Sequence, residues 1–239
     1  MRAAGWRALF LDFDGTLVGI RRRPEGVRCS TRMRGVLARL ALRPELWIGI
    51  VSGRRSRTLS RLIGVEGIHY RGVYGAESGD SALRISPAAR RALASVRNVL
   101  ARRLGRLAGL WMEHKGLSLV VHYRGARRPA ATRAEDILRR AMARAGPLLR
   151  VIAGHKSWEI VPREIPGKGA AVAAVMQSLP AGCMGICIGD DAADEEAFAA
   201  LPGGITIRVG RSGNSLARYF LRSPDEVLEW LIRFEEALP

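Results

Sequence analysis

The chain has 239 residues, which is enough for one large domain or two small ones with a sizeable buried core. Its apolar fraction of 48% and its mean hydropathy near zero are typical of an ordinary globular protein. No apolar stretch reaches the ~18 uncharged residues of a membrane span, and the first residues turn acidic too soon for a signal peptide. We therefore expect a cytoplasmic protein with no membrane partner.

The formal net charge of +17 comes almost entirely from arginine. A field of this sign attracts anions such as phosphorylated metabolites or nucleic acid. The arginines are scattered along helical patterns, however, and we find no compact basic tract that alternates with aromatic residues. We interpret the excess as compositional bias and expect no specific nucleic-acid partner. The three cysteines do not suggest a disulfide framework, and Cys183 and Cys187 are expected in the core.

The first 80 residues predict strands that alternate with helices. Residues 7–13 and 46–53 are apolar runs that predict buried strands, residues 68–75 predict a third strand, and the segments between them have helical spacing. Ser30 is the expected cap of the first helix, and Gly64 the expected end of the second. This alternation predicts a parallel sheet covered on both faces.

The middle of the chain has a different order of elements. A helix is expected from Ser86 to about Leu104, and residues 110–124 predict a hairpin that turns near Lys115. A second helix over 131–145 precedes a strand pair at 148–154 and 157–162. The order predicts antiparallel pairing with helices on one face, hence a separate small α+β domain.

The parallel pattern then resumes. Lys168 opens a helix, residues 184–190 and 204–210 predict strands, and residues 194–201 predict a short helix between them. The last helix begins at Ser223, with Glu226 in the capping-box position. We therefore predict a doubly wound α/β core, residues 1–82 and 167–239, with an α/β domain of residues 83–166 inserted into it.

Polar side chains follow several of the predicted core strands. Asp12 and Asp14 end the first strand, Ser52 the second, and Asp190 and Asp191 a late one; Lys168 begins a helix. Ligands of open α/β sheets bind at these carboxyl ends of the strands. Several carboxylates in one cleft repel each other, so we expect a cation, and ligands that are all oxygen favour Mg²⁺.

These residue types suit phosphoryl transfer, which needs positioning and charge neutralisation. Asp12 could attack phosphorus, and Asp14 could protonate the leaving oxygen and later activate water. Ser52 and the amides after it could hold the phosphoryl oxygens, and Lys168 could offset the negative charge. A calcium loop that begins at Asp12 is excluded, because its sixth and twelfth positions are Leu17 and Arg23.

The motifs "DFDGT", "SGR", Lys168 and "GDD", in this order, resemble those of the haloacid dehalogenase superfamily of phosphatases, and the middle domain resembles its inserted cap. Within that superfamily, the stretches "GVYGAE", "EHKGLSLVVHYR", "EIVP" and "GDDAADEEAF" resemble the trehalose-6-phosphate phosphatases. The resemblance covers nearly the whole chain.

The resemblance implies a role for each matching residue. Asp12 would be the nucleophile and Asp14 the general acid and base. Mg²⁺ would be held by the Asp12 carboxylate, the Asp14 carbonyl and Asp190, with Asp191 and Asp194 in support. The implied substrate-binding residues are Arg54, Tyr74, Glu113, Lys115 and Glu159, of which the last three would face sugar hydroxyls. Linkers near residues 82–86 and 162–167 would let the cap open and close.

Three departures from the family pattern concern the sugar more than the phosphate. Tyr74 stands where the family commonly has His, and Ala193 stands where it has Thr. His155 directly follows Gly154, where the family has Lys, and Lys156 comes one residue later. On a strand, a shift of one residue turns a side chain to the other face.

We therefore expect a monomeric Mg²⁺-dependent phosphatase that hydrolyses trehalose 6-phosphate through an aspartyl-phosphate. One alternative is a related capped phosphatase of another glycosyl phosphate, such as sucrose phosphate or mannosyl-phosphoglycerate. The alternative from another class is a non-catalytic, basic, polyanion-binding protein of the same fold. Trp111 and Trp158 are expected in the core of the inserted domain, the alternative being platforms for a sugar. His122 is either packed under its sheet or in contact with sugar.

Overall fold

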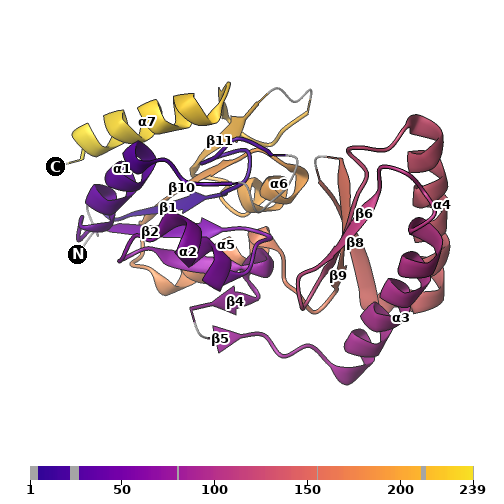
Figure 1. Ribbon diagram of the computed structural model, residues 1–239. Helices are drawn as coiled ribbons and strands as arrows, with labels where there is room; N and C mark the ends of the chain where they lie inside the picture. Colours follow the sequence, from indigo (N-terminus) through magenta and orange to yellow (C-terminus); the bar gives the residue numbers. More distant parts are fainter. Residues whose placement is uncertain (1–4, 22–26, 80, 155, 211–213, 239) are drawn as a thin grey trace. The chain divides into compact units, whose positions relative to one another are not determined.

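The computed structural model describes residues 5–21, 27–79, 81–154, 156–210 and 214–238. They form two compact units, and Figure 1 shows the elements of both. The core unit comprises Met1–Ala82 and Pro166–Pro239, and the inserted unit comprises Leu83–Ile165. In the described part of the chain, none of the helices combines the length and the apolarity needed to cross a bilayer.

The core unit is built on an eight-stranded sheet of order β12-β11-β10-β1-β2-β3-β4-β5. Strand β1 lies between β10 and β2 and is parallel to both. The parallel strands are β11 (Ile205–Val209), β10 (Met184–Gly189), β1 (Arg7–Leu11), β2 (Leu46–Val51) and β3 (His69–Gly72), and β12 (Tyr219–Leu221) joins them at one edge. The predicted doubly wound arrangement is therefore present.

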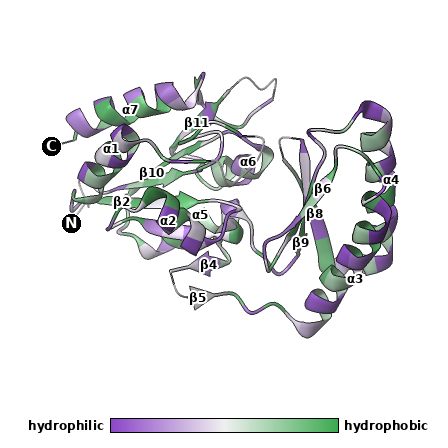
Figure 2. Cartoon of the chain, in the orientation of Figure 1, coloured by the Kyte–Doolittle hydropathy of each residue, from purple (hydrophilic) through white to green (hydrophobic). Residues whose placement is uncertain are grey.

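Helices cover both faces of this sheet, because consecutive residues of its strands are apolar and successive side chains point to opposite faces. Leu9 and Leu11 belong to a buried cluster with α1, α2 and α7, whereas Ala8 and Phe10 belong to another with α5 and α6. Figure 2 shows the hydrophobic colour concentrated along these strands. The helices are α1 (Thr31–Ala41), α2 (Ser56–Ile63), α5 (Lys168–Ser178), α6 (Ala192–Ala199) and α7 (Pro224–Glu236).

Several details of the core unit differ from the prediction. The strand predicted over residues 68–75 is shorter, His69–Gly72, because Val73–Gly75 form a 3-10 turn in which Val73 and Tyr74 have positive φ. The antiparallel strands β4 (Glu77–Ser78) and β5 (Ser81–Ala82), together with β12, were not predicted, because they are very short and carry no apolar alternation. Helix α6 begins at Ala192, two residues early. Ser223 is the N-cap of α7 as predicted, and its hydroxyl accepts the N–H of Glu226. The Glu226 carboxylate accepts the N–H of Arg222 instead of that of Ser223, so the predicted capping box is not completed.

The inserted unit is a four-stranded antiparallel sheet of order β6-β7-β9-β8. Its two helices both pack on one face of this sheet, as Figure 1 shows, and this confirms the predicted α+β layout. Its elements are α3 (Pro87–Leu104), β6 (Trp111–His114), β7 (Leu119–His122), α4 (Arg128–Ala145), β8 (Leu149–Gly154) and β9 (Ser157–Pro162). Helix α4 begins three residues earlier than predicted, because Pro129 fits its first turn.

The two faces of the inserted sheet have different compositions. Leu119, Val121 and Ile160 pack against α3 and α4. The intervening residues point to the other side, here called the helix-free face, which carries Trp111, Glu113, His122 and Glu159. The expectation that Trp111 is a core residue is therefore wrong, since its register places it on this face, where it is 38% exposed. Trp158 does pack against the helices.

Candidate active site

Three carboxylates and one ammonium meet at the carboxyl end of the core sheet. Asp12 follows β1 and Asp190 follows the neighbouring strand β10. Carboxylate oxygens of Asp12, Asp190 and Asp194 all lie within 4.8 Å of one another. The Nζ atom of Lys168, the first residue of α5, is 2.7 Å from Asp12 Oδ1 and 2.8 Å from Asp194 Oδ1. The structure thus brings together four of the residues predicted from the sequence.

Gly15 allows this close arrangement. Its φ of +90° lies in the left-handed region, and a Cβ there would be 2.1 Å from Asp190 Oδ2. Any side chain would therefore displace the Asp190 carboxylate from the cluster, in addition to straining the turn.

Asp194 supports the loop that carries Asp190. Its Oδ2 atom accepts the N–H groups of Asp190 and Asp191, at 3.0 and 3.1 Å, while its Oδ1 atom binds Lys168. Asp191 is the N-cap of α6, and the two aspartates form a capping box. The signal in the sequence was the spacing of two acidic residues three apart at a helix start, which the prediction did not use.

Asp14 lies in an ion pair outside the carboxylate cluster. Its two oxygens accept from Nε and Nη2 of Arg54, at 2.5 and 2.7 Å, and the Arg54 guanidinium lies 5.3 Å from the centroid of the Phe13 ring. Such a bidentate pair fixes both partners in orientation. The sequence predicted Arg54 as a substrate-binding residue, but the pairing with Asp14 required the structure.

Ser52 and Tyr74 belong to one turn at the ends of β2 and β3. The Ser52 carbonyl accepts the N–H of Tyr74 at 2.9 Å, and the Ser52 hydroxyl accepts the N–H of Arg54 at 3.2 Å. Tyr74 has φ of +56°, the preceding Val73 has φ of +48°, and the Tyr74 side chain is buried. Left-handed backbone at a β-branched residue is a strained conformation of the kind found at functional sites.

The polar residues predicted in the inserted unit lie on its helix-free face. Lys115 Nζ is 3.2 Å from Glu159 Oε2, and the Ser118 hydroxyl donates to Glu159 Oε1 at 2.5 Å. Glu113 Oε2 is 3.0 Å from His122 Nε2. Of the departures noted in the sequence, His155 lies outside the described residues.

Glu77 is a buried neighbour of the site that the sequence analysis did not identify. Its buried carboxylate accepts the N–H of Ser56 at 2.9 Å and pairs with Arg55 at 3.1 Å. The N-cap residue of α2, Arg55, provides no side-chain cap, so Glu77 supplies the missing acceptor and a negative charge at the helix N-terminus. It thereby fixes the segment that carries Arg54.

We predict that Glu77→Ala destabilises the protein by about 2–3 kcal/mol, since a charged hydrogen-bond acceptor is lost at a buried helix end. Urea denaturation would measure this loss as a lower midpoint. Glu66→Ala, at an exposed position, is the matched control and should change the midpoint little. Equal midpoints for the two variants would show that Glu77 does not hold α2.

The carboxylate cluster fits a bound cation. Burial raises the pKa of Asp12 to about 8, helped by the Asp190 and Asp191 charges and opposed by Lys168. Burial, with Asp191 and Asp194, raises the pKa of Asp190 to about 7. Asp190 Oδ1 is buried without a hydrogen-bond partner. One ammonium therefore does not satisfy these groups, and a cation with oxygen ligands would.

Without a bound cation, the protein should lose stability as the pH rises from about 5 to about 8. The folded state keeps protons on Asp12 and Asp190 up to about pH 8 and about pH 7, whereas the unfolded chain releases them near pH 4. The unfolded chain then binds fewer protons, so the free energy of unfolding falls by up to about 1.4 kcal/mol per pH unit for each such group.

Thermal melts in EDTA would show this as a Tm that falls across the window. Asp190→Asn removes one of the two groups and should flatten the dependence. A Tm that rises from pH 5 to pH 8 in EDTA would contradict a protonated cluster.

Several known proteins resemble this chain over most of its length. A family model described as trehalose-phosphatase matches residues 10–224. The trehalose-phosphate phosphatase of Mycobacterium ulcerans is 32% identical over 250 residues, which cover 97% of this chain and 62% of that protein. That of Mycobacterium leprae is 33% identical over 256 residues, covering 97% and 58%. The chain thus spans about three fifths of the length of the curated relatives it matches.

Among solved structures, the C-terminal domain of the Candida albicans trehalose-6-phosphate phosphatase superposes with a TM-score of 0.84 at 22% identity. The match covers 98% of this chain and 94% of that one. A haloacid dehalogenase-like hydrolase from Bacteroides thetaiotaomicron superposes with a TM-score of 0.69 at 16% identity, over 96% of this chain and 99% of that one. The predicted haloacid dehalogenase-like fold is therefore confirmed.

Proposed function

Because the chain belongs to the trehalose-phosphatase family, we propose that it hydrolyses trehalose 6-phosphate to trehalose and phosphate with the help of Mg²⁺. The observation that carries the proposal is the buried cluster of Asp12, Asp190, Asp194 and Lys168 at the carboxyl end of a parallel sheet. Nucleophilic carboxylate, cation site and ammonium are the parts that phosphoryl transfer needs.

In the proposed reaction, an Asp12 oxygen bonds to phosphorus as the bond from phosphorus to the sugar oxygen breaks. Asp14 donates a proton to that oxygen, so trehalose leaves as an alcohol. Asp14 then accepts a proton from water, whose oxygen attacks phosphorus and releases phosphate and the Asp12 carboxylate. Lys168 holds Asp12 in place, and Ser52 with the following amides binds phosphoryl oxygens.

Asp12, Asp190 and the Asp14 carbonyl would hold Mg²⁺, with Asp191 and Asp194 in support. When bound, the ion neutralises charge on the phosphoryl group and the carboxylates. Its need for oxygen ligands matches this donor set.

We further propose that Glu113, Lys115 and Glu159 recognise sugar hydroxyls, and that Arg54 and Tyr74 contribute from the core unit. The ion pair of Lys115 with Glu159 offers a donor and acceptors side by side, as a row of hydroxyls requires. Tyr74, in place of the His that is usual in the family, is the observation that keeps another glycosyl phosphate as a second candidate substrate.

A panel of phosphate esters tests the proposal. The purified protein would be offered trehalose 6-phosphate, sucrose 6-phosphate, mannosyl-phosphoglycerate and para-nitrophenyl phosphate, with Mg²⁺ or with EDTA, and phosphate release measured. The highest kcat/KM is expected for trehalose 6-phosphate with Mg²⁺. A higher value for another glycosyl phosphate would reject the substrate, and no release from any ester would favour the non-catalytic alternative.

A further inference from the structure

An aromatic pair stands out on the helix-free face of the inserted unit. Trp111 on β6 lies opposite His122 on β7, and the two rings stack with centroids 3.7 Å apart and planes inclined by 10°. The indole is nevertheless 38% exposed. A broad ring that is held flat by a second ring and still reaches solvent is a rigid surface for contact with a ligand.

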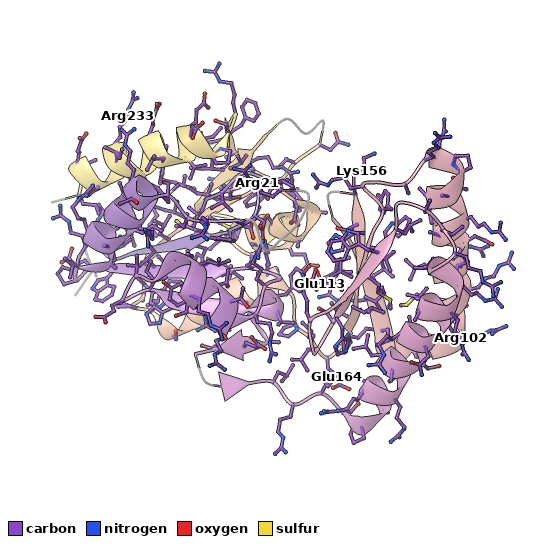
Figure 3. The ribbon with its side chains drawn as sticks, viewed as in Figure 1. Arg21, Arg102, Glu113, Lys156, Glu164 and Arg233 are labelled. Carbon is purple, nitrogen blue, oxygen red and sulfur yellow. The ribbon has the colours of Figure 1, made fainter. Side chains whose placement is uncertain are left out.

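This aromatic pair is connected to a polar group. His122 Nε2 is 3.0 Å from Glu113 Oε2. Glu113 follows Trp111 by two residues on the same strand, so both side chains are on the same face. Figure 3 shows Glu113 on β6, on the side of the sheet away from α3 and α4.

The next row of the face carries the ion pair. Glu113 and Glu159 flank Val120 across β6, β7 and β9, and Lys115 lies 3.2 Å from Glu159. Its neighbour Met112 packs in the apolar cluster under the helices, whereas Trp111 is not among the described residues of that cluster. The face therefore presents a flat apolar ring beside carboxylates and an ammonium.

That combination matches the chemistry of a sugar ring. A pyranose has an apolar face of C–H groups and an edge of hydroxyls, so it can stack on an aromatic ring while its edge is hydrogen-bonded. Apolar contact area with a few placed polar groups is the usual composition of a small-molecule site.

We propose that Trp111, backed by His122, is a stacking subsite for a sugar ring of the substrate, and that His122 is a positioning residue for Glu113. The inference rests on the proposed function, since it assigns the sugar of a glycosyl phosphate to this face. It goes further in naming the residues that bind the ring by its apolar side.

Steady-state kinetics on four variants test the subsite, with trehalose 6-phosphate and para-nitrophenyl phosphate as substrates. Trp111→Ala should raise KM for trehalose 6-phosphate about tenfold, equivalent to about 1.4 kcal/mol, while kcat changes less than twofold. The ratio of kcat/KM for the sugar phosphate to that for the aryl phosphate should fall by the same factor. Trp111→Phe keeps a ring and should lose less than threefold.

His122→Phe separates the two roles of the histidine, because it keeps a ring under Trp111 and removes the bond to Glu113. It should raise KM for trehalose 6-phosphate without lowering kcat, as expected for misplacement of a sugar ligand. His114→Ala is the matched control: His114 is exposed on the same strand and points to the other face. His114→Ala should leave kcat and KM for both substrates unchanged.

The inference is overturned if Trp111→Ala keeps the wild-type KM for every glycosyl phosphate that the wild type hydrolyses. If the wild type hydrolyses no glycosyl phosphate, the proposed function has failed, and a binding measurement then tests the subsite by itself. The indole N–H resonance of Trp111, identified by its absence from Trp111→Phe, would then be followed by NMR during titration with free trehalose. A saturable shift supports the subsite, and no shift rejects it.

Discussion

Asp12→Asn is expected to lower kcat for trehalose 6-phosphate by at least about a thousandfold, the scale of loss when a covalent nucleophile is removed. An amide is a very poor nucleophile toward phosphorus, and Asn is close to Asp in size, so the fold should persist. Asp12 is buried beside Lys168, and no other described carboxylate except Asp190 and Asp194 lies in this cluster. Phosphate release with Mg²⁺ would measure the loss.

Asp14→Asn is the informative comparison for this variant. Asp14→Asn should also lose most of its kcat. The Asp12 carboxylate can still attack phosphorus, but hydrolysis of the phosphate from Asp12 is slowed. Acid quenching followed by intact mass measurement should therefore find added phosphate on Asp14→Asn and none on Asp12→Asn. Near-normal turnover by Asp12→Asn would refute the covalent route.

Lys168→Met is expected to have the second largest effect, on both activity and stability. Lys168 is 2% exposed, and its ammonium contacts Asp12 and Asp194. Burial alone would lower the pKa of Lys168, but these two carboxylates outweigh it and hold the pKa well above its usual value. Above about pH 8, where Asp12 and Asp190 are ionised, removal of this cation leaves buried carboxylates uncompensated, which costs about 3–5 kcal/mol.

The variant should melt about 10 °C lower in EDTA, at about 2–4 °C per kcal/mol for a chain of this size. We expect Mg²⁺ to restore part of the Tm, since it supplies positive charge, but kcat to stay at least about a hundredfold down. Arg57→Met, which removes an exposed cation from α2, controls for net charge. A wild-type Tm for Lys168→Met in EDTA would mean that the carboxylates do not depend on this lysine.

Much of the core site was predictable from sequence, for a simple geometric reason. Asp12 and Asp190 each follow an apolar run, and the carboxyl ends of parallel strands lie at one edge of a sheet. Adjacency of β1 and β10 then brings the two carboxylates together without further information. Lys168 was predictable for the same reason, since its helix begins at that edge.

The partners within the site were not predictable, because they depend on distances across the fold. From the sequence alone, Arg54 could contact either the substrate or another residue of the protein. Its pairing with Asp14 depends on where the ends of β1 and β2 lie. Glu77 reads as an ordinary polar residue, and its burial at the start of α2 appears only when β3 and β4 pair. Short strands such as β12 were missed, since three residues carry too little pattern.

The order of strands in the core sheet also constrains how the chain acquires its structure during folding. Strand β1 pairs with β10, so residues 7–11 can form this pairing only when residues 184–188 are in place. The whole inserted unit lies between the two strands in the sequence. Pairing over so long a loop is slow, whereas the elements of the inserted unit are consecutive and close together in the chain. In pulse-labelling hydrogen exchange during refolding, amides of β7 and β9 should therefore gain protection before those of β1 and β10. On this sequence of events, Asp12 remains a solvated carboxyl until late in folding, and the environment that raises its pKa forms in one of the last steps.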